Sequence, residues 1–211
     1  MNTANLERNE LCDLFLEVGP DVPTLCEGWL ARDLAVHLVI RDRRPDAAAG
    51  MFVPFLAARK ERVQADIARQ PWEHVVETIR SGPPVWSPVR LDPINKGTNT
   101  IEFFVHHEDV RRAAPGWEPR PADRQRYAAL KAQIPFMAKL AFRKAKTSVA
   151  FDYEDGTVRA MRTVSGAPVV TIKGTPDEIV MYTLGRRTHA RVELDGDQAA
   201  VADFIAIFGD H

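Results

Sequence analysis

The sequence has little of what marks a secreted or membrane-spanning protein. Its 211 residues include only two cysteines, Cys12 and Cys26, whose spacing fits neither a disulfide framework nor a CxxC metal site. The amino terminus carries charges where a signal peptide needs an apolar run, and no later run approaches the roughly 18 residues that span a bilayer. We therefore expect a cytoplasmic protein with no membrane partner, whose cysteines are buried thiols.

An excess of one charge is missing too. The 28 Lys and Arg residues stand against 29 Asp and Glu residues, and this balance argues against a nucleic-acid partner. Gly and Pro occur at ordinary frequencies, with 12 and 15 residues, which excludes collagen-like and disordered chains. Phosphate-binding loops and the HExxH and GxSxG motifs are also absent. What remains is a globular protein of one large or two modest domains.

Helical periodicity dominates the first two thirds of the sequence. Apolar residues recur every three or four positions in five segments, with Gly19-Pro20 ending the first and Pro71 breaking the third. The predicted helices cover 5–18, 31–41, 52–80, 101–112 and 123–142, with a proline-rich connector at 81–97. Such a series is typical of an up-and-down helical bundle, which we place at residues 1–144.

The pattern changes near residue 145. Short runs rich in β-branched residues, separated by turn signals such as Asp155-Gly156, predict strands at 148–153, 157–163, 169–173 and 190–194. Thr175, Pro176 and Glu178 predict a capped helix that ends at Gly185, and 198–208 predicts a final helix. The fold class is therefore α+β, with a helical bundle followed by a small α+β domain at 145–211.

Three side chains of the predicted bundle have the chemistry of a metal site. Glu102 and His106 are four residues apart, so a helix stacks them on one face, and His37 can add a third ligand from another helix. Two imidazoles and one carboxylate leave a coordination position open, as in catalytic sites. Two other interpretations stay open: Glu102 as part of a helix cap begun at Asn99, and His37 as a core histidine bonded to a carbonyl.

The other candidate residues near this pair have different roles. His107 points about 100° away from His106 and cannot share its face. Asp109, three residues after His106, can reach back and orient its imidazole, or it can be an exposed acid near the end of the helix. The remaining histidines, expected at the surface or the terminus, are His74, His189 and His211.

Two segments carry a resemblance to a known family. Thr24-Leu25-Cys26-Glu27-Gly28-Trp29 with the following 32–38, and the segment 102–111, resemble the metal-binding domain of the mycothiol-dependent maleylpyruvate isomerase family, within the DinB-like four-helix-bundle superfamily. The chain looks closest to a subgroup described only as metal-binding proteins. Segments 174–178, 185–186 and 192–197 resemble the family's small α/β domain of sterol-carrier type. One departure is Leu30, which replaces a capping Ser or Thr and predicts a different start for that helix.

The resemblance implies a ligand set and a chemistry. The family's metal ligands correspond to His37, Glu102 and His106, and the metal would be Zn²⁺, with Ni²⁺, Fe²⁺ or Mn²⁺ as alternatives. Mycothiol would be the thiol cosubstrate, activated by the metal towards an electrophilic substrate in an isomerase or transferase reaction. Asp109 would orient a ligand and Arg186 would anchor a substrate carboxylate, with Arg187 and Arg191 as rivals. The alternative function is a non-catalytic metal-binding or sensing protein whose second domain binds a ligand.

Overall fold

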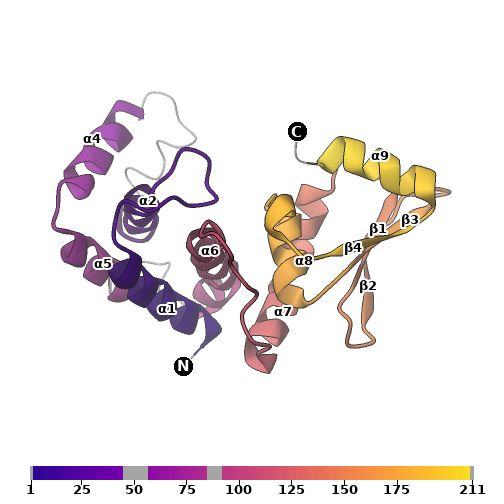
Figure 1. Ribbon diagram of the computed structural model, residues 1–211, viewed down its shortest axis with the longest axis horizontal. Helices are drawn as coiled ribbons and strands as arrows, with labels where there is room; N and C mark the ends of the chain where they lie inside the picture. Colours follow the sequence, from indigo (N-terminus) through magenta and orange to yellow (C-terminus); the bar gives the residue numbers. More distant parts are fainter. Residues whose placement is uncertain (1, 45–56, 85–91, 210–211) are drawn as a thin grey trace. The chain divides into compact units, whose positions relative to one another are not determined.

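The protein divides into a helical unit and a unit built around a sheet (Figure 1). The computed structural model describes residues 2–44, 57–84 and 92–209, and side chains within these ranges except those of 57 and 92–98. The two compact units are Met1–Pro119 and Arg120–His211. Helices together with one four-stranded sheet agree with the predicted α+β class.

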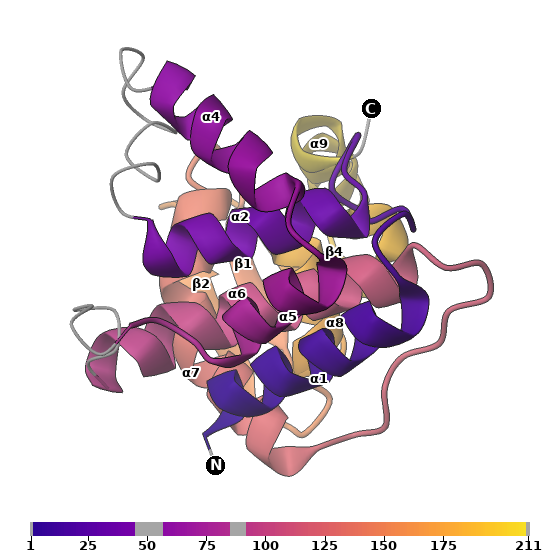
Figure 2. The ribbon, with the colours of Figure 1, turned by 90° about the vertical axis from the view of Figure 1, so that its left-hand side faces the viewer.

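The first unit consists of helices in its described part (Figure 2). Its helices are α1 (Thr3–Val18), α2 (Ala31–Arg43), α4 (Ala57–Ala68), α5 (Trp72–Arg80) and α6 (Asp92–Arg112). Helix α1 packs along α6 and α5, while α2 packs on α5 and α4. The predicted long helix 52–80 is two helices, because Pro71 precedes α5 as its cap residue; residues 52–56 lie outside the described ranges.

The ends of α1 and α2 follow from local hydrogen bonding. The Asn2 side chain accepts a hydrogen bond from the Asn5 amide at 2.9 Å, and Gly19, at φ +81°, ends α1 as predicted. Leu30 does not change the start of α2, which begins at Ala31 as the periodicity predicted. The Asp33 carboxylate instead accepts a hydrogen bond from the Leu30 amide at 3.0 Å, as in half of a capping box.

Helix α6 begins earlier than the sequence predicts. Its first residue is Asp92, so 92–97 of the predicted connector are helical, while 85–91 lie outside the described ranges. Asn99 is therefore inside the helix rather than at its start, and it is fully buried. The interpretation of Glu102 as part of a helix cap is wrong, because Glu102 lies in the middle of α6.

The core of the first unit is formed by the apolar faces of these helices. Phe15 at the end of α1 meets Trp72 at the start of α5 edge to face, with ring centroids 5.4 Å apart. The indole N–H of Trp72 donates to the Phe15 carbonyl at 3.0 Å. The fully buried members of this core include Leu11, Cys12, Phe15, Ala31, Leu34, Ala35, Val75 and Phe103. Burying this many apolar groups fixes α2 and α6 in the unit and thereby the candidate site that they carry.

The second unit surrounds a sheet with strand order β2-β1-β3-β4. Its elements are α7 (Arg124–Ala141), β1 (Ser148–Asp152), β2 (Val158–Arg162), β3 (Val169–Lys173), α8 (Pro176–Thr183), η4 (Arg187–His189), β4 (Glu193–Gly196) and α9 (Gln198–Phe208). β1 pairs antiparallel with β2 and parallel with β3, and β3 pairs antiparallel with β4. The fourth strand begins at Glu193, later than the sequence predicts.

Helix α7 belongs to this second unit. It packs on α8 and β2 and is followed by Phe142, whose ring lies 6.3 Å from Phe151 of β1 and 5.4 Å from Phe208 of α9. The sequence placed residues 120–144 with the bundle, but the compact units separate at Pro119. Amphipathic spacing shows that a helix has an apolar face without showing which partner covers that face.

Helix α8 starts and ends where predicted, with one difference in its cap. Thr175 precedes Pro176, and Gly185, at φ +90°, follows the helix. The predicted capping box is absent, because Glu178 accepts from the Arg191 amide at 2.7 Å and Thr175 makes no side-chain cap bond. None of the helices in the described part of the chain is long and apolar enough to cross a membrane.

Candidate metal centre

Three side chains from α2 and α6 converge in the helical unit. Nε2 of His37 lies 3.2 Å from Oε1 of Glu102, and Nε2 of His106 lies 3.4 Å from the same oxygen. Their side chains are 22%, 26% and 12% exposed for His37, Glu102 and His106 respectively. The rings of His37 and His106 stand edge to face at 5.4 Å, and the Trp29 ring lies 5.4 Å from His37. The His37 ring thus contacts a carboxylate, in place of the core carbonyl of the alternative interpretation.

The donor set of this cluster fits a divalent metal ion. Its three donor atoms all lie within 4.8 Å of one another. Ligand bonds of about 2.0–2.1 Å at tetrahedral angles would separate two donors by about 3.3 Å, which is close to the two observed separations. Two imidazole nitrogens and one carboxylate oxygen are ligands that Zn²⁺, Fe²⁺ and Ni²⁺ accept, and three protein ligands leave further positions open.

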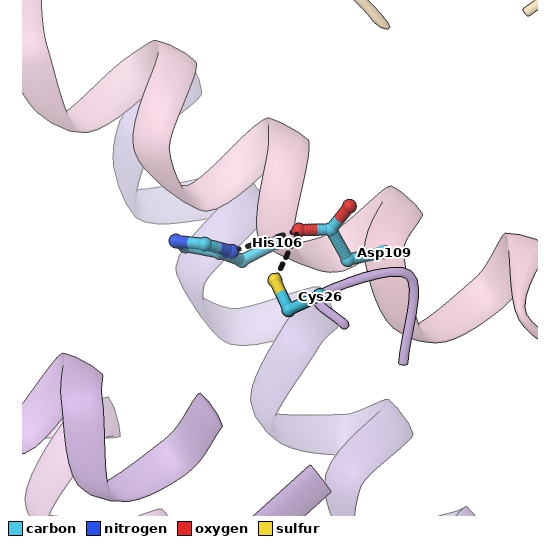
Figure 3. Close-up of side chains that lie close together, drawn as sticks. All are labelled: Cys26, His106 and Asp109. Atoms are coloured by element: carbon cyan, nitrogen blue, oxygen red, sulfur yellow. Dashed lines mark hydrogen bonds and ion pairs between the residues drawn. The ribbon is translucent and has the colours of Figure 1, made fainter. Parts of the chain in front are cut away.

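The Asp109 carboxylate contacts Nδ1 of His106, the ring nitrogen that does not face Glu102 (Figure 3). Its Oδ2 lies 3.0 Å from Nδ1 of His106 and 3.3 Å from Sγ of Cys26. The carboxylate is completely buried, and the backbone carbonyl of Asp109 accepts from the Leu25 amide at 3.0 Å. When Nδ1–H donates to this carboxylate, Nε2 is left as the nitrogen that faces His37 and Glu102.

The charged groups of the cluster stabilise one another in their ionised forms. Burial favours a raised pKa for Glu102, but hydrogen bonds from His106 and His37, with the charge of Arg41, bring that pKa well below its usual value. Burial favours a lowered pKa for His106, but its contacts with Asp109, Cys26 and Glu102 raise that pKa well above its usual value. Without a metal ion, His106 and Glu102 therefore form an ion pair, and a metal ion would take the place of a proton.

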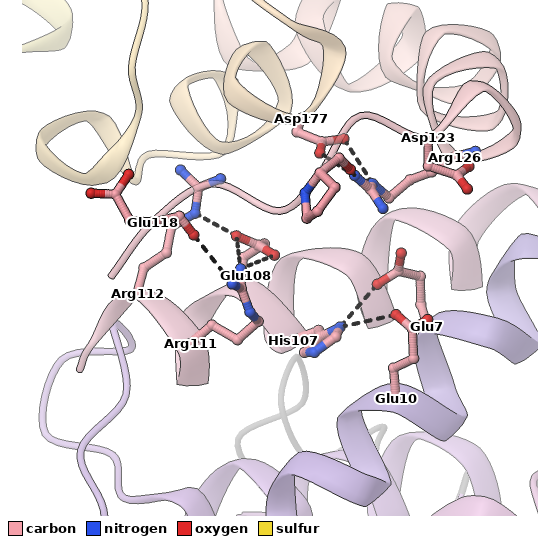
Figure 4. Close-up of polar contacts among 11 residues, drawn as sticks. Glu7, Glu10, His107, Glu108, Arg111, Arg112, Glu118, Asp123, Arg126 and Asp177 are labelled. Carbon is pink, nitrogen blue, oxygen red and sulfur yellow. Dashed lines mark hydrogen bonds and ion pairs between the residues drawn. The ribbon is translucent and has the colours of Figure 1, made fainter. Parts of the chain in front are cut away.

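His107 belongs to a different cluster (Figure 4). Its Nδ1 lies 3.1 Å from Oε2 of Glu7 and 3.9 Å from Oε2 of Glu10, both on α1. His107 and Glu7 are buried, whereas Glu10 is about half exposed. As the 100° step along the helix predicts, His107 does not share the face of His106. On the same helix, the buried Glu108 pairs with Arg111 and Arg112.

The other predicted residues in the described part of the chain come from elements other than α2 and α6. Arg186 is in the second unit, where its Nη1 donates to the Leu184 carbonyl at 2.8 Å. Arg187 and Arg191, its rivals, belong to the same unit. His74 on α5 is exposed and His189 is half-buried beside Thr188, whereas His211 lies outside the described residues.

Two residues beside the cluster were not predicted to belong to it. Cys26 is half-buried beside Asp109 rather than a simple core thiol, because the 19–30 loop lies against α6 through the Leu25 amide. Arg41 lies four residues after His37 and places Nε 3.2 Å from Oε1 of Glu102. The spacing of His37 and Arg41 is the signal that could have found Arg41. No spacing signal connects Cys26 to Asp109, because loop docking is a tertiary contact.

Comparison with known proteins supports the fold. No protein-family model and no curated protein matches the chain. Among solved structures, the mycothiol-dependent maleylpyruvate isomerase is similar with a TM-score of 0.57 and 16% identity, over 92% of this chain and 90% of that one. A histidine-to-alanine mutant of that enzyme is similar with a TM-score of 0.58 and 15% identity over the same shares. At these identities, the similarity establishes a shared fold.

Proposed function

We propose that the protein is a metal-dependent enzyme that uses a low-molecular-weight thiol, of the isomerase or transferase type. His37, Glu102 and His106 would hold the metal ion, with Zn²⁺ as the first candidate. The observation that carries the proposal is the convergence of two imidazole nitrogens on one carboxylate oxygen in a partly exposed cluster. The fold shared with an isomerase that depends on mycothiol supports the choice of thiol.

Each residue of the cluster has a distinct task in this proposal. When bound, the metal ion would supply a coordination position at which a thiol loses its proton, since a free thiol is only a few per cent ionised at neutral pH. His37 and His106 bring neutral nitrogen donors and Glu102 brings one negative charge. Asp109 keeps the His106 ring in one orientation through the 3.0 Å contact with Nδ1.

Arg186 completes the proposal on the resemblance alone. A guanidinium is suited to binding a substrate carboxylate with two parallel hydrogen bonds. Changing Arg186 to Met should weaken turnover, or anion binding, and leave the metal content unchanged. Equal turnover in the wild-type protein and the Arg186→Met variant would remove Arg186 from the mechanism and leave the metal ligands untouched.

The experiment that tests the thiol proposal uses the full chain loaded with Zn²⁺ or Co²⁺ and titrated with mycothiol at fixed pH. We expect release of about one proton per thiol bound and a change in the Co²⁺ absorption spectrum. Unsaturated carboxylates and other electrophiles are then screened for conversion that requires the thiol. His106→Ala should abolish both responses, and His74→Ala, at an exposed position of α5, should retain them.

One result would favour the other class of function. If the protein keeps its metal ion but no small thiol alters the proton balance or the Co²⁺ spectrum, thiol activation is wrong. The non-catalytic metal-binding or sensing function then becomes the better account of the same three ligands.

A further inference from the structure

Arg41 is a cation beside the candidate metal centre that the proposed function does not use. It lies one turn after His37 on α2, so the two side chains are on the same face of that helix. Its Nε is 3.2 Å from Oε1 of Glu102, and its Nη1 donates to Oδ1 of Asn99 at 2.6 Å and to Oδ1 of Asp42 at 3.2 Å. These contacts hold the guanidinium against the cluster.

The guanidinium keeps donor capacity after these contacts. They use Nε and Nη1, and among the described residues Nη2 has no hydrogen-bond partner. The Arg41 side chain is 20% exposed, which is similar to the exposure of His37 and Glu102. The solvent-facing part of the cluster therefore includes a cationic group that can still donate. Its planar, permanently charged fork matches the geometry of a carboxylate.

The charge balance around Arg41 also favours an anion. Asp42 is paired with the buried Arg8, and Glu102 is paired with Arg41, so these four groups cancel in charge. His37 and His106 are neutral as metal ligands. The buried Asp109 carboxylate behind His106 adds one negative charge, so the cluster with a bound divalent ion would still carry a net positive charge. Such a site attracts an anionic group and not only a neutral one.

We propose that Arg41 forms an anion subsite beside the three metal-binding residues and takes a carboxylate group of the ligand bound there. The subsite selects a thiol or a substrate that carries a carboxylate over one that lacks it. This inference rests on the proposed function, because the metal centre brings the ligand within reach of Arg41. Arg41 also contacts Glu102, so its substitution can alter metal binding, and the test must separate the two effects.

Two thiols that differ by a carboxylate provide the test. The Co²⁺-loaded protein is titrated with 3-mercaptopropionate and with 2-mercaptoethanol, and each dissociation constant is taken from the Co²⁺ absorption. The wild-type protein should bind 3-mercaptopropionate at least about tenfold more tightly, as expected for a charge-assisted hydrogen bond. Arg41→Met should remove this preference, and Arg41→Lys should keep part of it because the charge remains. Arg43→Met is the matched control, since Arg43 on the same helix donates to the Gly82 carbonyl instead.

The thiol preference distinguishes the subsite from a general effect on the metal centre. Chelator competition measures the Co²⁺ affinity of each variant, and the preference is a ratio within one variant, so a general loss of metal affinity does not imitate it. Equal binding of the two thiols by the wild-type protein overturns the subsite and leaves the thiol-dependent function standing. A preference that persists in Arg41→Met, or disappears only in Arg186→Met, also overturns it.

A third titration distinguishes this inference from the proposed function itself. Maleate, a dicarboxylate without a thiol, is added to the same Co²⁺-loaded variants. Binding of maleate that weakens at least about tenfold in Arg41→Met, with no response to either thiol, supports the subsite and contradicts thiol activation. If thermal unfolding shows that Arg41→Met does not fold, Arg41→Lys is used in its place. The subsite is then overturned if Arg41→Lys has the same thiol preference and the same maleate affinity as Arg43→Met.

Discussion

His106 and His107 are consecutive residues of α6, yet they belong to clusters of different composition. His106 meets a second imidazole and one carboxylate, whereas His107 meets two carboxylates of α1. In both clusters, three donor atoms lie within 4.8 Å of one another. A step of one residue, or about 100° around the helix, separates them. Short distances between donor atoms therefore do not by themselves identify a catalytic centre.

The two clusters differ in the number of imidazole donors and in the exposure of their side chains to solvent. The Glu7 and His107 side chains are 3% and 7% exposed, so solvent reaches that cluster mainly through Glu10. The cluster at His106 exposes two of its three members by more than a fifth and has a buried carboxylate behind its imidazole. We interpret the cluster at His107 as a contact that joins α1 to α6, and the cluster at His106 as a ligand site. The following predictions test this difference.

The largest expected effect is on metal affinity. His106→Ala should weaken Zn²⁺ binding by more than about a hundredfold, since losing a ligand costs more than losing a supporting contact, which costs about 10–100-fold. His107→Ala should leave the affinity within about threefold of the wild-type value. Chelator competition, with metal analysis of the purified proteins, measures both. Equal loss of Zn²⁺ in the two variants would contradict the assignment of separate roles.

Removal of the metal ion should distinguish the clusters through stability. At free Zn²⁺ a hundred times the dissociation constant, the ion should raise the free energy of unfolding by about 2.7 kcal/mol. This increment should appear in wild-type protein and in His107→Ala, and it should vanish in His106→Ala. Urea unfolding with and without a chelator measures it. A Zn²⁺-dependent increment that survives in His106→Ala would place the ion elsewhere.

Asp109 and Glu108 provide a smaller contrast on the same helix. Asp109→Asn keeps the shape but weakens the contact with Nδ1 of His106, so Zn²⁺ affinity should fall by about 10–100-fold. Glu108→Gln weakens pairing with Arg111 and Arg112 and should lower stability without a comparable change in affinity. Calorimetric titration with Zn²⁺ compares the two variants. A larger loss of affinity in Glu108→Gln would show that Asp109 does not orient the ligand.

The smallest expected effect is on the chemical reactivity of the two cysteines, which differ in burial. Cys12 on α1 is fully buried, and burial raises its pKa to about 12, whereas Cys26 is half-buried beside Asp109. In folded protein at pH 8, an alkylating reagent should therefore modify Cys26 and spare Cys12, as peptide mass analysis would show. Modification of both thiols at similar rates would contradict the described burial of Cys12.

The same shift predicts a pH dependence of stability. The folded pKa of Cys12 lies above the value of 9.0 for the free side chain. Its contribution to stability is therefore fully present below pH 9 and is lost as the pH rises towards 12. Between pH 8 and 10, wild-type protein should lose about 1.4 kcal/mol more stability than Cys12→Ala. Parallel stability profiles of the two proteins would show that Cys12 ionises normally.

Local patterns were enough to predict most elements of the fold. Gly19, Pro71 and Gly185 act within a few residues of their own positions, so the end of α1, the start of α5 and the end of α8 follow from sequence. The start of α1 at Thr3, two residues before the predicted start, was missed because the cap at Asn2 was not identified. The sequence analysis placed α7 in the helical bundle, whereas it packs in the second unit, and this difference has another cause. Its apolar residues reveal a buried face, but only the packed structure shows that α8 and β2 cover this face.

The candidate site follows the same division. The spacing of Glu102 and His106 predicted one shared face, because a helix alone determines that relation. The meeting of His37 with this pair, the loop contact of Cys26 and the pairing of Arg41 with Glu102 depend on how α2 packs in the unit. His37 was a candidate both from its place on the second predicted helix and from the resemblance. Its spacing to Arg41 could have indicated Arg41, whereas no spacing in the sequence connects Cys26 to the cluster.

The loop between α1 and α2 also limits how the chain can vary in length. Backbone bonds join Thr24 to Trp29 at 3.1 Å and Ala31 to Val22 at 2.9 Å, and Leu25 is bonded to Asp109. Surface loops usually tolerate insertions, because their backbone is bonded mainly to solvent. An added residue here would displace the Leu25 amide from Asp109, the residue that contacts His106. Insertions should instead be tolerated at the exposed hairpin turn of Asp155 and Gly156, so natural length differences belong there and not in this loop.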